Sequence, residues 1–163
     1  MKTMKLFAAL ALLAATPAFA SGTNKKPNTK AEAVSLNPDQ LQWGAAPPNL
    51  PKGAQLAVLQ GDPSKKAPFV MRLKMPAGYK IAPHWHSADE EVTVLSGTFV
   101  LHMGDTMDAP GATLEAGGFH FLPAKMHHAA EAKEETIVQV NGMGPFDIHY
   151  LNPAEDPSKQ AAE

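Results

Sequence analysis

The sequence predicts an all-β domain, and three observations support this prediction. From Ala54 onward, short apolar or alternating runs recur about every ten residues, with glycine and proline between them. These runs are rich in β-branched and aromatic residues, which favour strands. Between Ala54 and Leu151 no run keeps a helical period over about eleven residues. A single barrel or sandwich of roughly eight to ten strands is therefore expected.

The expected strands follow these runs in order along the chain. They lie at residues 54–60, 69–75, 90–96, 98–103, 112–116, 119–123, 136–142 and 146–151. The preceding segment, "LNPDQLQWGAAPPNLPKG", contains too much proline for a helix. We expect it to cover the domain, with Trp43 as its anchor.

The two ends of the chain differ in composition from the strand-rich part. Residues 1–20, "MKTMKLFAALALLAATPAFA", combine two lysines, a short apolar stretch and Ala-Phe-Ala, which is typical of a secretory signal peptide cut after Ala20. Residues 21–35 are predicted to be a flexible linker and residues 153–163 a flexible tail. The domain, with its covering segment, is then expected at 36–152, in a protein that is periplasmic or secreted.

Composition restricts both partners and chemistry. The formal net charge is −2 and becomes about −4 without the two lysines of the signal peptide, so nucleic acid is not an expected partner. No membrane span is expected after cleavage. The chain contains no cysteine, which excludes disulfides, thiolate metal ligands and cysteine nucleophiles. A metal would have to bind histidine, carboxylate or, less favourably, methionine.

The stretch "GYKIAPHWHSADEEVTVLSG" gathers two histidines and three acidic residues in twenty positions. Side chains two apart on a strand point to the same face, so His84 and His86 can converge on one ion. A strand that restarts at Glu90 places this carboxylate on the same face as Val92 and Val94. A carboxylate on an apolar face is costly unless it is paired or coordinated, so we expect Glu90 to meet a cation.

The spacing Gly78, His84, His86, Glu90, Gly97 resembles the first motif of the cupin family, G-x5-H-x-H-x3-E-x6-G, at every fixed position. The second cupin motif, G-x5-P-x-G-x2-H-x3-N, is similar to "GGFHFLPAKMHHAAEA". Counted from Gly117, the proline is Pro123 and the histidine is His128. Two positions depart from the motif, since Lys125 replaces its glycine and Ala132 its asparagine.

The resemblance implies a cupin (jelly-roll-like) β-barrel that holds one divalent transition metal on four residues: His84, His86, Glu90 and His128. Such a set leaves one or two positions for water, substrate or dioxygen. Imidazole and carboxylate ligands suit Fe, Mn, Ni, Cu, Co or Zn, so the ligands do not choose the metal.

Several alternatives accompany this assignment. Glu91 and His127 are the neighbouring rivals of Glu90 and His128, and the motif spacing favours the latter pair. His120 is a candidate cavity base, although a histidine between phenylalanines is more often structural. Six methionines at 71, 75, 103, 107, 126 and 143 are interpreted as core residues rather than copper ligands.

Three further residues, Phe121, Arg72 and Tyr79, are candidates for ligand binding. Phe121 is expected to line an apolar pocket together with Val92 and Val94. Arg72 and Tyr79 are candidates for binding an anionic substrate.

Two functions are compatible with the predicted metal-binding barrel. The first is an exported metal-dependent enzyme, an oxygenase, decarboxylase or isomerase, that acts on a small organic molecule. The second is a metal-binding or small-ligand-binding protein without turnover, a sensor or scavenger. Cupins frequently pair through their edges, so a homodimer is also expected.

Overall fold

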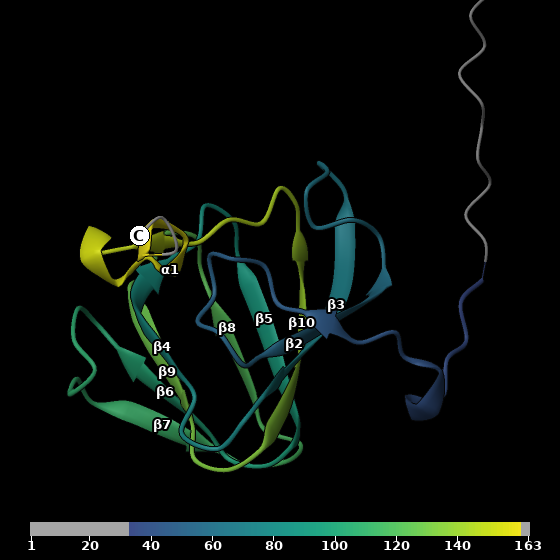
Figure 1. Ribbon diagram of the computed structural model, residues 1–163, viewed down its shortest axis with the longest axis horizontal. Helices are drawn as coiled ribbons and strands as arrows, with labels where there is room; N and C mark the ends of the chain where they lie inside the picture. Colours follow the sequence, from purple (N-terminus) through teal and green to yellow (C-terminus); the bar gives the residue numbers. More distant parts are fainter. Residues whose placement is uncertain (1–32, 161–163) are drawn as a thin grey trace, which may run out of the picture. The chain divides into compact units, whose positions relative to one another are not determined.

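The computed structural model describes residues 33–160. The strands of this part of the chain form two antiparallel sheets (Figure 1). The six-stranded sheet contains, in spatial order, β1 (Gly44–Ala45), β2 (Gln55–Gln60), β3 (Pro68–Met75), β10 (Thr136–Met143), β5 (Glu90–Ser96) and β8 (Phe119–Leu122). The five-stranded sheet contains β11 (His149–Tyr150), β4 (Lys80–Trp85), β9 (His128–Ala132), β6 (Phe99–Met103) and β7 (Gly111–Leu114). The predicted all-β class is confirmed.

The core lies between the two sheets. Strand β5 alternates, so it buries Glu90, Val92 and Val94 while Glu91 points to solvent. From the six-stranded sheet Leu73 and Val138 enter the same cluster as Ile81, Leu101 and Ala130 from the five-stranded sheet. This alternation of buried and exposed side chains is what a sheet with one solvated face requires.

The observed strands follow the predicted runs, with three differences. Each of the eight expected runs contains a strand, as in β2 at 55–60 and β10 at 136–143. Strand β4 was expected only through the spacing of its histidines, and β1 and β9 were not expected at all. β9 has the sequence "HAAEA", and alanine and glutamate are poor strand formers. It pairs on both sides, with β4 and β6, so tertiary packing decides its conformation.

The proline-rich segment before β2 packs against the domain through specific contacts. The Tyr79 hydroxyl donates to the Pro51 carbonyl at 2.6 Å, and the Tyr150 hydroxyl donates to the Asn49 carbonyl at 2.7 Å. Trp43 is half-buried, and the Lys74 ammonium lies 4.5 Å from its ring centroid. Residues 46–51 are therefore held by two tyrosines that belong to the five-stranded side of the molecule.

The ends of the domain contain short helical turns. A 3-10 helix, η1 (Pro38–Gln40), precedes β1, and η2 (Pro153–Glu155) and α1 (Pro157–Gln160) follow β11. The last two lie in the segment predicted to be a flexible tail, whose flexibility stays a prediction. The predicted signal peptide at 1–20 and nearly all of the predicted linker at 21–35 lie outside the described residues. Within residues 33–160, no helix has the length and hydropathy needed to cross a membrane.

Candidate metal site

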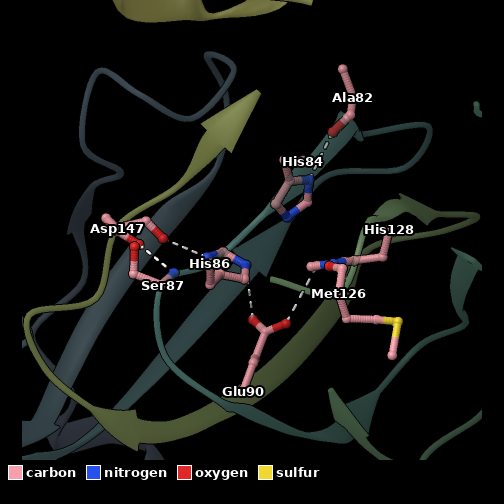
Figure 2. A network of polar contacts seen from close by, with 8 residues as sticks. All are labelled: Ala82, His84, His86, Ser87, Glu90, Met126, His128 and Asp147. Carbon is pink, nitrogen blue, oxygen red and sulfur yellow. Dashed lines mark hydrogen bonds and ion pairs between the residues drawn. The ribbon is translucent and has the colours of Figure 1, made fainter. Parts of the chain in front are cut away.

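Four predicted ligands meet between the two sheets, and we call His84, His86, Glu90 and His128 the candidate metal site. His84 on β4 and His128 on β9 are direct cross-strand partners, which brings their rings to a centroid distance of 4.1 Å. His86 follows the last residue of β4, and Glu90 begins β5 in the opposite sheet. Figure 2 shows the four side chains pointing toward one another.

The site is buried and its atoms are close. Relative exposure is 3% for His84, 6% for His86, 9% for Glu90 and 3% for His128. One ring nitrogen from each histidine lies within 4.8 Å of the others, a geometry that suits one metal ion. The carboxylate oxygens of Glu90 lie 3.7 Å from His86 Nε2 and 3.5 Å from His128 Nε2. The structure thus brings together all four predicted residues, while their role as ligands stays a prediction.

Backbone carbonyls orient all three imidazoles in the same way. Nδ1 of His84 donates to the Ala82 carbonyl at 2.7 Å, and Nδ1 of His128 donates to the Met126 carbonyl at 3.0 Å (Figure 2). Nδ1 of His86 donates to the Asp147 carbonyl, sixty-one residues away in the chain. A neutral ring that carries its proton on Nδ1 has its lone pair on Nε2, which is therefore the nitrogen free to bind a metal.

The electrostatics favour the protonation states that metal ligands need. Burial, together with the neighbouring His128 and His86, lowers the pKa of His84 to about 3. Burial also lowers the pKa of His86, against the opposing effect of Glu90. For Glu90, burial alone would raise the pKa, but the contact with His128 and the charges of His86 and His128 lower it to about 2. At neutral pH, His84 and His86 are therefore neutral and Glu90 is ionised, which are the forms that coordinate metals.

A cation fits this set of donors. His86 Nε2 is buried and has no hydrogen-bond partner among residues 33–160. A buried polar atom without a partner costs roughly 1–3 kcal/mol, so the arrangement is incomplete as it stands. A divalent metal between the Nε2 atoms and the Glu90 carboxylate would satisfy both, with three nitrogens and one oxygen as ligands.

Lys125, one of the two departures from the cupin motifs, does not change the backbone conformation of the turn. Lys125, at the motif's glycine position, adopts φ of 65°, the left-handed conformation that glycine takes without penalty. Its N–H donates to the His86 carbonyl at 2.8 Å. The turn that holds His86 next to the second motif is therefore kept, at the cost of a strained lysine.

The rival residues of the sequence analysis point elsewhere. Glu91 is exposed on the outer face of β5, and His127 is 41% exposed and hydrogen-bonded to Asp105 at 2.8 Å. Two further histidines also have partners outside the site: His102 Nδ1 donates to the Ala109 carbonyl, and the His149 ring stacks on Trp85 at a centroid distance of 4.0 Å.

The methionine interpretation is only partly correct. Met71, Met75 and Met103 belong to or pack against the core. Met126 and Met143 are 41% and 51% exposed, so they are surface residues.

One expectation about the pocket is wrong, and two others stay predictions. Phe121 was expected to line the interior, but it is 49% exposed because β8 turns Phe119 and Phe121 outward and His120 and Leu122 inward. Arg72 and Tyr79 each have a protein partner, and their role in binding an anionic substrate stays a prediction. The Arg72 Nε–H donates to Gln139 Oε1 at 3.3 Å, and the Tyr79 hydroxyl is engaged by Pro51.

Two cavities flank the candidate metal site. The inner cavity, about 40 Å³, is lined by His84, Glu90, His128 and His120 and is closed by core side chains such as Val92. Its volume admits water but no organic molecule of ordinary size. Both ring nitrogens of His120 are buried there and lack a partner among the described residues, so His120 faces this cavity without a defined contact.

The outer cavity lies on the other side of His86 and has about 180 Å³, and we call it the outer pocket. The residues that characterise it are Asn49, Leu56, Met71, His86, Phe146 and Ile148. Phe146 stacks on the His86 ring with 4.4 Å between centroids. A third cavity of about 720 Å³, between residues 45–54 and the C-terminal helices, contains none of the four candidate ligands.

Sequence reasoning missed the residues that complete the site from a distance. Asn49 and Phe146 line the outer pocket, and the Asp147 carbonyl orients His86. No local pattern marks them, because each lies far along the chain from the histidine pair and meets it only through folding.

Comparison with solved structures agrees with this architecture. Similar structures include the polyketide cyclase RemF from Streptomyces resistomycificus, at 14% identity over 81% of this chain and 94% of that chain, with a TM-score of 0.65. A putative acetylacetone dioxygenase from Methylibium petroleiphilum PM1 matches at 21% identity over 82% and 96%, with a TM-score of 0.60. An RmlC-like cupin from Shewanella frigidimarina NCIMB 400 matches at 16% identity over 71% and 94%, with a TM-score of 0.55.

The described part of the protein therefore has the cupin fold, as the resemblance of its two motifs implied. The sequence profile of the family described as a domain of unknown function (DUF4437) matches residues 9–149, and the chain belongs to this family. The comparison with curated proteins found no match.

Proposed function

We propose that this protein is an exported, metal-dependent cupin enzyme that acts on a small organic molecule. The observation that carries the proposal is the position of His86. Its ring belongs to the candidate metal site on one side and lines an apolar pocket of about 180 Å³ on the other. An apolar cavity with a few convergent polar groups is the usual form of a small-molecule site.

Each residue has a defined part in this proposal. His84, His86, Glu90 and His128 would hold one divalent metal, which would supply Lewis-acid or oxygen-activating chemistry. Phe146 stacks on the His86 ring and so helps to fix its orientation. The ionised Glu90 supplies a negative charge, which imidazole ligands do not provide. The solved cupins of similar fold include proteins described as a dioxygenase and a cyclase, but a shared fold does not select the reaction.

One observation favours the second function, binding without turnover. Asp147 is the acidic residue of the outer pocket, and its carboxylate is already engaged by the Ser87 N–H at 2.7 Å and by His149 Nε2 at 2.9 Å. Within the described residues, the outer pocket therefore offers no free carboxylate for acid–base catalysis. A sensor or scavenger would need none.

Metal content of the protein purified from the periplasm tests the site. Wild type should contain one metal per chain by mass spectrometry, and His86→Ala and His128→Ala should contain almost none. Glu90→Gln, which keeps the shape and removes the charge, should bind the metal at least about tenfold more weakly, since even the loss of a residue that only orients a ligand costs about 10–100-fold.

His127→Ala is the matched control, because its ring is the exposed neighbour of His128. It should retain wild-type metal content. Absence of metal in wild type, or equal content in all variants, would overturn the proposed site. Metal without oxygen consumption or turnover of any small organic compound tested would favour the binding protein.

N-terminal sequencing of the exported protein should start at Ser21, and a chain retained with residues 1–20 would contradict export with cleavage.

A further inference from the structure

The Asp147 carboxylate connects two residues that lie beside the candidate metal site. Asp147 Oδ1 accepts from the Ser87 N–H at 2.7 Å, and Asp147 Oδ2 accepts from His149 Nε2 at 2.9 Å. Ser87 Oγ lies 3.2 Å from the same His149 nitrogen. We call Ser87, Asp147 and His149 the Asp147 cluster. None of the three is a candidate metal ligand, so metal binding alone does not account for this cluster.

The Asp147 cluster does not have the geometry of a hydrolase triad. In such a triad the carboxylate holds one ring nitrogen of the histidine and the serine hydroxyl meets the other. Here Ser87 Oγ and Asp147 Oδ2 both meet Nε2 of His149. The His149 ring stacks on Trp85 with 4.0 Å between centroids, and the two residues are cross-strand partners of β11 and β4. The cluster therefore connects β11 to the end of β4 rather than activating a nucleophile.

The cluster reaches the candidate metal site through the backbone of Asp147. The Asp147 carbonyl accepts from Nδ1 of His86, while its carboxylate accepts from the N–H of the next residue, Ser87 (Figure 2). One residue therefore holds both the His86 imidazole and the backbone that follows it. Among residues 33–160, the backbone N–H of Asp147 has no backbone acceptor. The hydrogen bonds of its side chain and its carbonyl are thus the ones that fix its position.

Among the three histidines of the site, His86 is the one oriented from far along the chain. Nδ1 of His84 and Nδ1 of His128 each donate to the carbonyl two residues earlier. The acceptor for His86 comes from sixty-one residues away, and Phe146 of the same segment stacks on its ring at 4.4 Å between centroids. The orientation of His86 therefore depends on how the segment with Phe146 and Asp147 is held.

We propose that the Asp147 carboxylate is a positioning group for His86. By fixing the Asp147 backbone to Ser87 and His149, it keeps the Asp147 carbonyl against Nδ1 of His86, so that Nε2 is directed to the candidate metal site. Loss of an outer partner of a ligating histidine lowers metal affinity about 10–100-fold. In its effect on metal affinity this inference rests on the proposed function, whereas the orientation of His86 requires no metal.

Three substitutions at Asp147 separate position from charge. Asp147→Ala removes the carboxylate, Asp147→Asn keeps an oxygen for the Ser87 N–H without the charge, and Asp147→Glu keeps the charge but displaces it by one methylene. Co²⁺ is titrated into metal-free protein at neutral pH and followed by visible absorption, with His86→Ala as the background of binding elsewhere. Asp147→Ala and Asp147→Glu should bind Co²⁺ about 10–100-fold more weakly than wild type. Asp147→Asn should bind nearly as tightly as wild type.

Asp156→Ala is the matched control. The Asp156 carboxylate makes the same kind of contact, with the Ser158 N–H at 3.0 Å, in the segment after β11. This variant should keep the wild-type affinity for Co²⁺.

The hydrogen bond of His86 gives a second readout without metal. NMR of the imidazole nitrogens in metal-free protein should place the His86 proton on Nδ1 in wild type and in Asp147→Asn. In Asp147→Ala this proton should exchange faster or move to Nε2. A variant that is only less stable would leave this signal unchanged.

Asp147→Asn that binds Co²⁺ as weakly as Asp147→Ala would overturn the inference, since charge rather than position would then act. If Asp147→Ala does not fold, weaker binding by Asp147→Asn than by Asp147→Glu overturns it equally. A His86 proton on Nε2 in metal-free wild type would overturn it without any variant.

The result separates from that of the proposed function. A wild type that binds no metal, but whose Nδ1 proton signal is lost in Asp147→Ala, would keep the positioning of His86 and remove the metal site. A wild type that binds Co²⁺ with the same affinity as all three Asp147 variants would do the reverse.

Discussion

Acidification should destabilise the metal-free protein chiefly through His84. The unfolded chain has an ordinary histidine pKa near 6.5, whereas burial and the other two histidines lower the pKa of folded His84 to about 3. Below about pH 6.5 the unfolded state therefore takes up a proton that the folded state refuses. Stability from His84 is complete above this pH and is lost as the pH falls toward 3.

The two pKa values set the size of the effect. Between about pH 7.5 and about pH 5 the unfolded His84 becomes almost fully protonated and the folded one stays neutral, which costs about 2 kcal/mol. His86, whose pKa is also lowered by burial, acts in the same direction. Glu90 adds little in this window, because its stabilising contribution is lost only as the pH falls from about 4.5 toward 2.

Urea unfolding of chelator-treated protein across this pH range measures the loss. Wild type should lose at least about 2 kcal/mol, and His84→Gln, which does not titrate, should lose about 2 kcal/mol less than wild type over the same interval. His127→Gln removes an exposed histidine outside the site and should follow wild type. If the free energies of His84→Gln and wild type run parallel with pH, the argument from burial is refuted.

Two backbone positions give further predictions of stability by urea unfolding. Gly78 and Gly97 both have a positive φ, at 75° and 78°. A Cβ added at Gly78 would meet no described atom within 4 Å. A Cβ added at Gly97 would lie 2.4 Å from the Glu135 carbonyl oxygen. Gly78→Ala should therefore cost about 1–2 kcal/mol, and Gly97→Ala clearly more, and equal losses would contradict the packing at Gly97. Lys125→Gly should leave stability unchanged or raise it by up to about 1 kcal/mol, because relief of the strained φ exceeds the added freedom of the unfolded chain. A loss of more than about 1 kcal/mol would show that the Lys125 side chain contributes more than its conformation costs.

The fold class and the four residues of the candidate site were accessible from the sequence. Alternation along β5 places Glu90, Val92 and Val94 on one face, and this pattern depends only on the period of a strand. The spacing of His84, His86, Glu90 and His128 agrees with two cupin motifs, and the structure brings these four side chains together. Local periodicity and motif spacing can both be recognised from the sequence without knowledge of the tertiary structure.

Other features were not accessible for physical reasons that particular residues illustrate. Strand β9 has an alanine-rich sequence with poor strand propensity, and its neighbours β4 and β6 impose its conformation. Phe121 was wrongly predicted to face the interior, because the sequence does not distinguish an exposed aromatic residue on an edge strand from a buried one. Lys125 replaces a motif glycine, and only the three-dimensional turn shows that it keeps the left-handed backbone.

The sequence by itself determined the all-β class, the cupin motifs and the residues that form the candidate metal site, since these depend on local period and spacing. Tertiary structure alone decided what surrounds that site. Phe146 and the Asp147 carbonyl contact His86, and Asn49 lines the same pocket, although all three lie far from His86 in the sequence. Contacts across such separations depend on how the sheets pack and on which segment covers them, and no short stretch of sequence encodes that arrangement.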